Sequence, residues 1–523
     1  MMRPPQENWV ITKPARISQH GIVVAQHAGA ATIGAEMLAA GGNAVDAAVA
    51  TALALAVLEP WMSGLGGAGF LLYGEGGSDR VALVDFSAVA AQRLNPGRFR
   101  LTGAVSPELF GWPEVEEDRN LIGYESICVP GAVDGLGLAV ERFGRKSLAE
   151  VIAPALALAE AGLPIDWHTS LHIALFSAEL ARFDASSALY LPGGHPPAPS
   201  RGDPPRRLPL PALTRTLQRL ATAGRRDFYE GELAAALVRD LGAGGSPIDG
   251  GDLAHYHASV IEPLSLDYRG VTFHAASALS GGPTFLEAMA ALDRRLPGGT
   301  MGYPDADAYL AYAETLTAAF AKRTAELGHV MPPGSNTSHV SVVDRDGNMV
   351  SLTNTLLGYF GSKVVAPGTG ILMNNGMMWF DPSPGAKNSI AAGARPLANM
   401  CPLLVTRGGV PWAALGACGG RAIIPAMVQL ASFMVDFNMS LESAFATPRL
   451  DASGPNLLCE ARLAPDIIAA LSARFPLEMV ENTLYPPRFA APSAVTHNHP
   501  TGRNTGMAHI LSPAAAAIIE PVS

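Results

Sequence analysis

The residues best suited to chemistry lie in one short stretch, Asn336-Thr337-Ser338-His339. A loop rich in proline and glycine, residues 331–335, runs into this stretch, and an alternating β-type pattern with an Asp346-Gly347 turn follows it. The pattern predicts a threonine at the point where a loop enters a buried strand. A cut before Thr337 would give that residue a free α-amine beside its own hydroxyl. Since an α-amine has a pKa near ~7.7–8, base and nucleophile would then belong to one residue.

Spacing alone leaves simpler interpretations open for these motifs. A threonine at the start of a strand is common, and β-propensity is enough to explain it. The glycines between Gly64 and Gly69 also fit the G-x-G-x-x-G pattern of dinucleotide sites. They follow a helix-like run and precede a strand-like one, residues 70–73, and a dinucleotide fold needs the opposite order. The sequence therefore gives no support to a nicotinamide-dependent enzyme.

Further motifs accompany the threonine stretch in a fixed order. They are Gly41-Gly-Asn-Ala-Val-Asp-Ala-Ala-Val-Ala-Thr51, Ser63-Gly-Leu-Gly-Gly-Ala-Gly-Phe70, Val129-Pro-Gly-Ala-Val-Asp-Gly135, Ser280-Gly-Gly282, Gly370-Ile-Leu-Met-Asn-Asn375, Arg395-Pro-Leu397 and Gly419-Gly420. With residues 337–348, this set resembles the γ-glutamyltranspeptidase family of N-terminal-nucleophile hydrolases. The resemblance extends over roughly residues 21–510.

The resemblance implies a role for each matching position. The chain would cleave itself at the Asn336–Thr337 bond, and Thr337 would be the nucleophile. Thr355 matches the threonine that hydrogen-bonds the nucleophile, and Gly419 and Gly420 match the glycines of the oxyanion hole. Fragments 1–336 and 337–523 would form the large and small subunits of one body and stay associated. The family's reaction requires no metal and no cofactor. The resemblance leaves open whether the body forms a higher homo-oligomer.

The substrate-binding positions depart from the family pattern. Ser87 replaces the arginine that grips the α-carboxylate of a γ-glutamyl group, and Leu357 replaces an asparagine. Trp379 follows the Asn-Asn pair, where the family has polar groups for the α-amine. Ala398 and Asn399 replace a Ser-Ser pair. Burying a zwitterion without these partners would cost several kcal/mol, so free γ-glutamyl compounds are expected to be poor substrates.

A different acyl group is therefore expected. Relatives with altered pockets include oxamate amidohydrolases, poly-γ-glutamate-cleaving enzymes and glutaryl cephalosporin acylases. Leu357, Met377 and Trp379 indicate a partly apolar acyl pocket, and Arg395 and Arg421 are candidate partners for a substrate carboxylate or members of structural ion pairs. The segment between residues 380 and 395 is shorter than the lid loop of many relatives, which favours hydrolysis over transfer.

Two rivals to this amidohydrolase hypothesis remain. One is a γ-glutamyl hydrolase or transferase with a rearranged clamp, and the other is a non-catalytic relative that keeps the fold as a binding protein.

Composition limits the partners and the location that this protein can have. The 523 residues are 48% hydrophobic and 16% charged, which is ample for a large core, and the net charge of −10 disfavours nucleic acid as a partner. The longest apolar run, residues 47–58, is too short to span a bilayer, and residues 1–13 lack the apolar core of a signal peptide. No membrane partner and a cytoplasmic location are therefore expected. The four cysteines have neither metal nor redox spacing and are expected to be small buried residues.

The elements that must position these residues come in mixed runs. The patterns predict helices over two halves of residues 31–58 with Asn43 as an N-cap, and over residues 147–161, 212–221, 230–241, 284–296, 305–327, 423–437 and 465–475. Strands are predicted over residues 70–73 and 80–86 and throughout the region after residue 340, and residues 192–210 are predicted to be a surface loop. This order favours an α+β fold over a doubly wound sheet. The four-layer αββα sandwich is what the resemblance implies.

Overall fold

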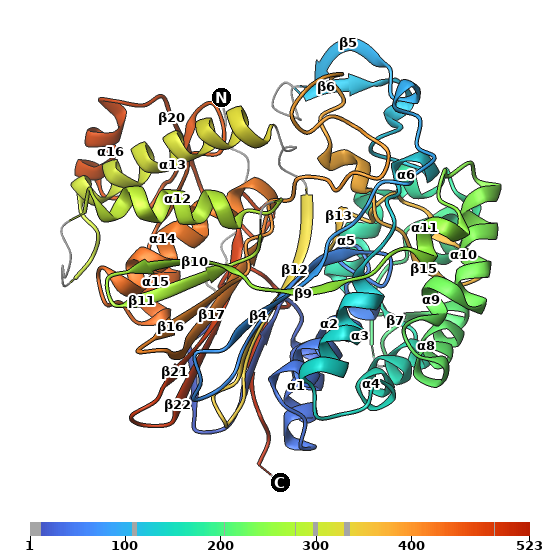
Figure 1. Cartoon of the computed structure of the whole chain (residues 1–523), viewed down its shortest axis with the longest axis horizontal. Coiled ribbons are helices and arrows are strands. Elements are labelled where there is room, and N and C mark those ends of the chain that lie inside the picture. The colour runs from blue at the N-terminus through green and yellow to red at the C-terminus, as the bar shows by residue number, and fades with distance from the viewer. Residues whose placement is uncertain are drawn as a thin grey trace.

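The computed structural model describes residues 12–106, 112–202, 204–277, 279–296, 302–328, 335–485 and 487–522. Two seven-stranded sheets lie face to face at its centre, and helices cover the outer face of each sheet (Figure 1). This is a four-layer αββα sandwich, as predicted. Within the described residues, no helix is both long enough and apolar enough to cross a membrane.

The first sheet carries the residues of the threonine stretch. Its strand order is β23-β2-β12-β13-β3-β4-β9, and its pairings are antiparallel. The strands are β2 (Ile22–Ala25), β3 (Ala68–Gly74), β4 (Val81–Phe86), β9 (Ser259–Ile261), β12 (Ser335–Val343), β13 (Met349–Gly358) and β23 (Ala516–Ile519). β12 and β13 lie in the interior of the sheet. β12 pairs with β13 along most of its length and with β2 at residues 341–343.

The second sheet has the order β1-β22-β21-β17-β16-β11-β10 and is also antiparallel. Its strands are β1 (Arg16–Ser18), β10 (Leu264–Tyr268), β11 (Val271–Ala275), β16 (Leu403–Arg407), β17 (Val410–Cys418), β21 (Ala491–Asn498) and β22 (Arg503–Ala508). β17 and β21 face β12 of the first sheet. Smaller sheets hold the remaining described strands. Three are strand pairs: β5 (Leu101–Ser106) with β6 (Trp112–Val115), β7 (Leu163–Pro164) with β8 (Arg207–Leu208), and β14 (Val365–Ala366) with β15 (Ile371–Leu372). The fourth has three strands: β18 (Leu450–Asp451), β19 (Leu457–Glu460) and β20 (Leu477–Val480).

The period of two along each strand divides the core into layers. In β2, Ile22 and Val24 belong to the cluster between the sheets, whereas Val23 and Ala25 pack with the helices outside. Phe70 alternates with its neighbours in the same way on β3. Because both faces of the first sheet are covered, all ten residues of β13 are buried.

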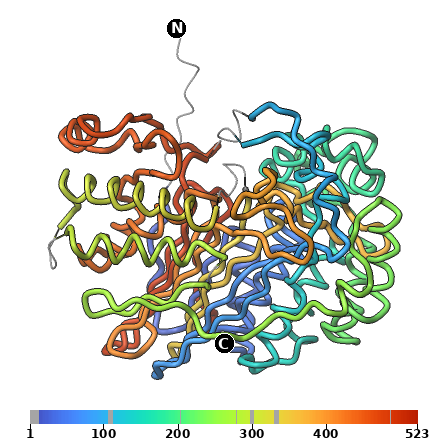
Figure 2. The backbone as a smooth tube through the Cα atoms, turned by 45° about the horizontal axis from the view of Figure 1, so that its top comes forward, coloured from blue at the N-terminus to red at the C-terminus, as the bar shows by residue number. Residues whose placement is uncertain are grey.

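The helices form one group on each side of the two sheets, as Figures 1 and 2 show. The first sheet is covered by α1 (Ala28–Ala39), α2 (Ala44–Leu58) and α3 (Ala132–Phe143), with α4 (Leu148–Ala161) and α8 (Pro211–Ala223) packed outside them. The same side holds α5 (Trp167–Leu175), α6 (Ser177–Leu180), α7 (Asp184–Tyr190), α9 (Asp227–Glu230), α10 (Glu232–Ala243) and α11 (Gly250–Ala254). The second sheet is covered by α12 (Gly282–Asp293), α14 (Ile423–Val435) and α15 (Leu441–Ala446), with α13 (Ala306–Leu327) and α16 (Pro465–Ser472) outside.

Every helix expected from the sequence is present, although some ends differ by a few residues. The break between α1 and α2 falls at Gly41-Gly42, and Asn43 is the N-cap of α2, as predicted. The strand that holds Thr337 differs from the prediction. It begins at Ser335, so the threonine lies inside the strand and not at its entrance. Residues 331–334 of the predicted loop lie outside the described residues.

The N-cap of α2 gives a direct test of how the start of this helix is held against the end of α3. The Asn43 side chain accepts hydrogen bonds from the N–H groups of Val45 and Asp46, and its Nδ2 donates to the Phe143 carbonyl at 2.7 Å. We expect Asn43→Ala to lower the free energy of unfolding by about 1–2 kcal/mol in urea. Asn95→Ala, which removes an exposed cap from a short 3-10 turn, is the matched control and should change stability little. An equal effect of the two substitutions would contradict the account.

Candidate functional site

Thr337 occupies a β-bulge in the centre of the first sheet. On β12 and β13, Asn336 pairs with Leu357 and Ser338 pairs with Asn354, so the register shifts at the residue between them. A bulge turns one residue out of the regular ladder and re-aims its side chain. Thr337 is buried, with 1% of its surface exposed.

Two hydroxyl groups converge on one backbone carbonyl at this bulge. The Thr337 hydroxyl donates to the Asn336 carbonyl at 2.6 Å and lies 3.5 Å from the Thr355 hydroxyl. Thr355 donates to the same carbonyl oxygen and accepts a hydrogen bond from the Leu357 N–H at 2.9 Å. The structure therefore brings the predicted nucleophile, its predicted partner and the predicted scissile bond together. Thr355 also contacts the carbonyl, a partner that the sequence did not predict.

Close approach to β13 explains two glycines of the motif, Gly67 and Gly69. A Cβ on Gly67 would lie 2.5 Å from the Thr355 carbonyl oxygen, so only glycine lets the two backbones pack this closely. The motif lies between α2 and β3, as expected, and supports the strand that carries Thr355.

The two predicted oxyanion glycines form a tight turn at the end of β17. Gly419 has φ 134° and Gly420 has φ 58°, and both values favour glycine. A Cβ on Gly419 would lie 2.7 Å from the Ala490 Cα. The short helix that follows, η6 (Gly420–Ala422), lies beside β12. The turn is therefore adjacent to the strand of Thr337.

The predicted replacement at Ser87 has an unexpected neighbour. Arg395 reaches this position from a segment distant in sequence, and its guanidinium donates to the Ser87 carbonyl at 3.0 Å and to the Ser87 hydroxyl at 2.5 Å. The Ser87 hydroxyl in turn donates to Asp85 at 2.7 Å, and the Arg395–Asp85 ion pair has a separation of 3.8 Å. A cation therefore lies beside Ser87, and Asp85 partly neutralises it.

Three other predicted binding residues pack together. Leu357, Trp379 and Ala398 belong to one buried apolar cluster between the sheets, whereas Met377 packs in a separate cluster with Cys128. Leu357 has φ 79°, a left-handed conformation that is uncommon for a leucine and more readily adopted by asparagine. The Trp379 indole N–H is buried without a hydrogen-bond partner in the described part of the chain.

Asn399 lies elsewhere, on a cavity of about 330 Å³. Arg421, which directly follows Gly420, and Arg323 from α13 also line this cavity. Burial lowers the pKa of Arg323 to about 10, so its guanidinium stays charged at neutral pH. Among the described residues no acidic side chain forms an ion pair with Arg323, and the buried Asn399 Nδ2 has no hydrogen-bond partner. Arg323 and Arg421 therefore bring positive charge to the cavity, and the nearby Asp451 offsets part of it.

The asparagines around the site are structural in part. Asn374 bonds the backbone of Cys128 and Gly66, and Asn375 bonds Leu121 and Gly358. The four cysteines are free and buried, as predicted. In the described ranges, no group of three or more His, Cys, Asp or Glu side chains is arranged to hold a metal ion.

Comparisons with known proteins identify the family of this chain. The family model described as gamma-glutamyltranspeptidase matches residues 30–331 and 328–507. The chain belongs to the γ-glutamyltranspeptidase family. It is 33% identical to the acylase ACY 1 proenzyme of Pseudomonas sp. (strain V22), over 95% of this chain and 93% of that relative. It is 32% identical to a glutathione hydrolase proenzyme of Pseudomonas sp. (strain A14), over 83% and 81% of the two chains.

A cephalosporin acylase from Bacillus halodurans has the same fold, with a TM-score of 0.83 at 24% identity over 99% of both chains. Membership of the family confirms the predicted class, an autoprocessing amidohydrolase of the N-terminal-nucleophile type.

His339, two residues after Thr337, is held as a neutral side chain. Its Nδ1 lies 2.8 Å from the Thr353 hydroxyl and its Nε2 3.1 Å from the Ser341 hydroxyl, and burial lowers its pKa to about 3. In the unfolded chain a histidine takes up a proton near pH ~6.5.

The pKa difference predicts a pH dependence of stability. Folding stability should fall as the pH drops from ~6.5 towards 3, by at most ~1.4 kcal/mol per pH unit for this group. We expect His339→Gln to reduce this slope in urea unfolding measured across the same range. Other buried histidines contribute equally to both proteins, so equal slopes would show that His339 is not the neutral group described.

Proposed function

We propose that this chain cleaves itself between Asn336 and Thr337 and then hydrolyses an amide through an acyl-enzyme on Thr337. The convergence of the Thr337 and Thr355 hydroxyls on the Asn336 carbonyl is the observation that carries the proposal. Residues 1–336 and 337–523 would be the large and small subunits. They would remain associated because β12 and β13 pair with β2 and β3 of the large subunit.

Self-cleavage would proceed in two steps. The Thr337 oxygen attacks the Asn336 carbonyl carbon, the C–N bond breaks, and the hydroxyl proton passes to the departing nitrogen, which becomes the α-amine. Water then opens the resulting ester, which leaves a carboxylate on Asn336 and a free hydroxyl on Thr337. The Thr355 hydroxyl would stabilise the negative charge that develops on the carbonyl oxygen in the first step.

Amide hydrolysis would reuse the same residue. The α-amine of Thr337 removes the hydroxyl proton as the oxygen attacks the substrate carbonyl, and it returns the proton to the departing amine. The N–H groups of the Gly419–Gly420 turn would stabilise the oxyanion; removal of one such donor typically costs ~10²–10³ in rate. Water then releases the acyl group. No step uses a cofactor.

The first experiment tests the two threonines. Thr337→Ala should remain one chain and hydrolyse no amide, because the hydroxyl and the new α-amine are both lost. Thr355→Val should cleave itself slowly, by ~10²-fold or more, since it keeps the shape but loses the hydrogen bond to the carbonyl. Intact mass against time measures both variants. Normal self-cleavage by Thr337→Ala would overturn the proposal.

The acyl group is inferred from the cavity beside the catalytic turn. Arg323 and Arg421 bring positive charge to it, and Asn399 offers an unused buried donor. A buried unpaired donor is costly unless a ligand satisfies it. We therefore infer an acyl chain that ends in a carboxylate and lacks the α-amine of glutamate, as in a glutaryl amide. The related cephalosporin acylase makes a cephalosporin side-chain amide a reasonable compound to assay.

A matched set of anilides tests this inference. We expect kcat/KM to be higher for the glutaryl anilide than for the neutral butyryl or the γ-glutamyl anilide. Arg421→Gln should reduce the preference for glutaryl over butyryl by ~10-fold, which corresponds to ~1.4 kcal/mol. Arg80→Gln, which removes an exposed arginine paired with Glu75, should leave it unchanged. A preference unaffected by Arg421→Gln would contradict the inference.

Arg395 supports a second candidate function. Its guanidinium contacts Ser87, which by the resemblance replaces the family's clamp arginine, so Arg395 could bind the α-carboxylate of a γ-glutamyl group. Rapid turnover of the γ-glutamyl anilide at low KM, lost in Arg395→Gln, would favour this γ-glutamyl hydrolase over the glutaryl amidase.

A further inference from the structure

One segment contacts the bulged strand on both sides of the predicted scissile bond. This segment, residues 59–63, joins α2 to β3. The Trp61 carbonyl accepts a hydrogen bond from the Asn336 Nδ2 at 3.0 Å, just before the bond. The Ser63 hydroxyl donates to the Ser338 hydroxyl at 2.8 Å, just after it.

The same segment also holds β13 and the turn that follows it. The Met62 carbonyl accepts from the Leu356 N–H at 3.1 Å, and the Trp61 carbonyl accepts from the Phe360 N–H at 3.0 Å. Leu356 directly follows Thr355, so the segment fixes the partner strand beside the second catalytic hydroxyl. Phe360 has φ 56°, and the fixed N–H helps to hold this turn in its left-handed conformation.

Such contacts matter because the regular ladder is interrupted at Thr337. The bulge leaves the residue outside the alternating pairing of β12 and β13, so strand pairing alone does not fix its backbone. Attack on the preceding carbonyl requires close and well-oriented atoms, and a small displacement can cost ~10²-fold in rate. The 59–63 segment supplies hydrogen bonds at the position where the ladder lacks them.

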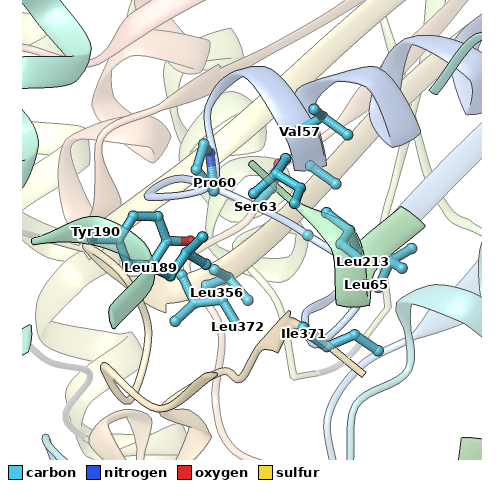
Figure 3. Close-up of a pocket in the computed structure, with 14 residues that line it drawn as sticks. Val57, Pro60, Ser63, Leu65, Leu189, Tyr190, Leu213, Leu356, Ile371 and Leu372 are labelled. Carbon is cyan, nitrogen blue, oxygen red and sulfur yellow. The ribbon is translucent and has the colours of Figure 1, made fainter. Parts of the chain in front are cut away.

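The segment is itself firmly anchored. Trp61 is 1% exposed and stacks on His172, with ring centroids 5.0 Å apart, and His172 stacks on Tyr359 at 5.1 Å. The Glu59 N–H caps α2 through the Leu55 carbonyl, which ties the segment to the helix. Figure 3 shows Pro60 and Ser63 on the wall of a small cavity with Leu356 and Leu372. At about 20 Å³ the cavity holds about one water molecule, too little for a substrate.

We propose that the 59–63 segment positions the scissile bond for self-cleavage, with Asn336 and Ser63 as the positioning residues. This proposal rests on the proposed self-cleavage at Thr337. The two residues act at different stages. Asn336 becomes the end of the large subunit after cleavage, so its bond to Trp61 serves the uncut chain. Ser63 keeps its bond to Ser338 beside the new N-terminus, so it also orients the nucleophile in the mature enzyme.

Substitutions separate these two stages. Asn336→Asp has nearly the same shape but places a carboxylate oxygen against the Trp61 carbonyl, and it should lengthen the half-time of self-cleavage by ~10-fold or more. Ser63→Ala should also slow self-cleavage, and in the mature enzyme it should lower kcat while leaving KM nearly unchanged. Both half-times would be measured by intact mass on freshly translated chain.

Matched controls distinguish positioning from general stability. Asn504→Asp alters another buried carboxamide, which donates to the His20 carbonyl, and Ser126→Ala removes another buried hydroxyl, which donates to the Gly123 carbonyl. Both controls should mature at the wild-type rate. Tm is measured for all four substitutions in a Thr337→Ala background, which keeps the chain whole.

The outcomes are distinct. Slow cleavage by Asn336→Asp and Ser63→Ala, at a Tm no lower than that of the controls, supports the proposal. Wild-type half-times for both variants would overturn it, as would a delay that simply follows the loss of Tm across all four substitutions. Self-cleavage by Thr337→Ala itself would instead remove the proposed function on which the inference rests.

Discussion

The structure depends on one backbone carbonyl, that of Asn336, which accepts hydrogen bonds from two threonine hydroxyls in a buried strand. In a regular strand this carbonyl would bond a neighbouring N–H, and no hydroxyl would approach it. The bulge at Thr337 releases it from the ladder, and the hydroxyls of Thr337 and Thr355 take the place of the N–H. A polarised carbonyl beside the predicted nucleophile is the arrangement that the proposed attack on the chain's own backbone requires.

The four-layer sandwich makes this arrangement possible. β12 and β13 are interior strands covered on both faces, so water is excluded and each neighbour is fixed by packing. Gly67 allows β3 to approach the Thr355 backbone, and the turn at Gly419 is brought beside β12 by the second sheet. Outside this catalytic centre, the buried Arg323 and Asn399 leave positive charge and an unused donor in one cavity. These are the geometry and the charge that the proposed self-cleavage and the proposed acyl binding require.

Much of this was predictable from the sequence because the relevant signals are local. Asn43, the Asp346-Gly347 turn and the apolar periodicity give element positions, and the threonine and glycine motifs give the family and the candidate catalytic residues. Contacts between distant segments were not predictable. Arg395 reaches Ser87 across the fold, and Trp61 acts through a backbone carbonyl, which leaves no signature in residue type. The bulge that places Thr337 inside its strand depends on pairing register, which the alternating pattern does not fix.

The central claim is that Thr337 becomes a new N-terminus, and the intact mass of the purified wild-type protein under denaturing conditions tests it most directly. The account predicts two species in equal amounts, one ending at Asn336 and one beginning at Thr337, which together account for the 54.4 kDa chain plus one water. A single uncut chain in folded protein that hydrolyses amides, or a cut at any other bond, would contradict the account. An uncut chain without amidase activity would contradict it too, and would favour a non-catalytic relative or one that matures under other conditions.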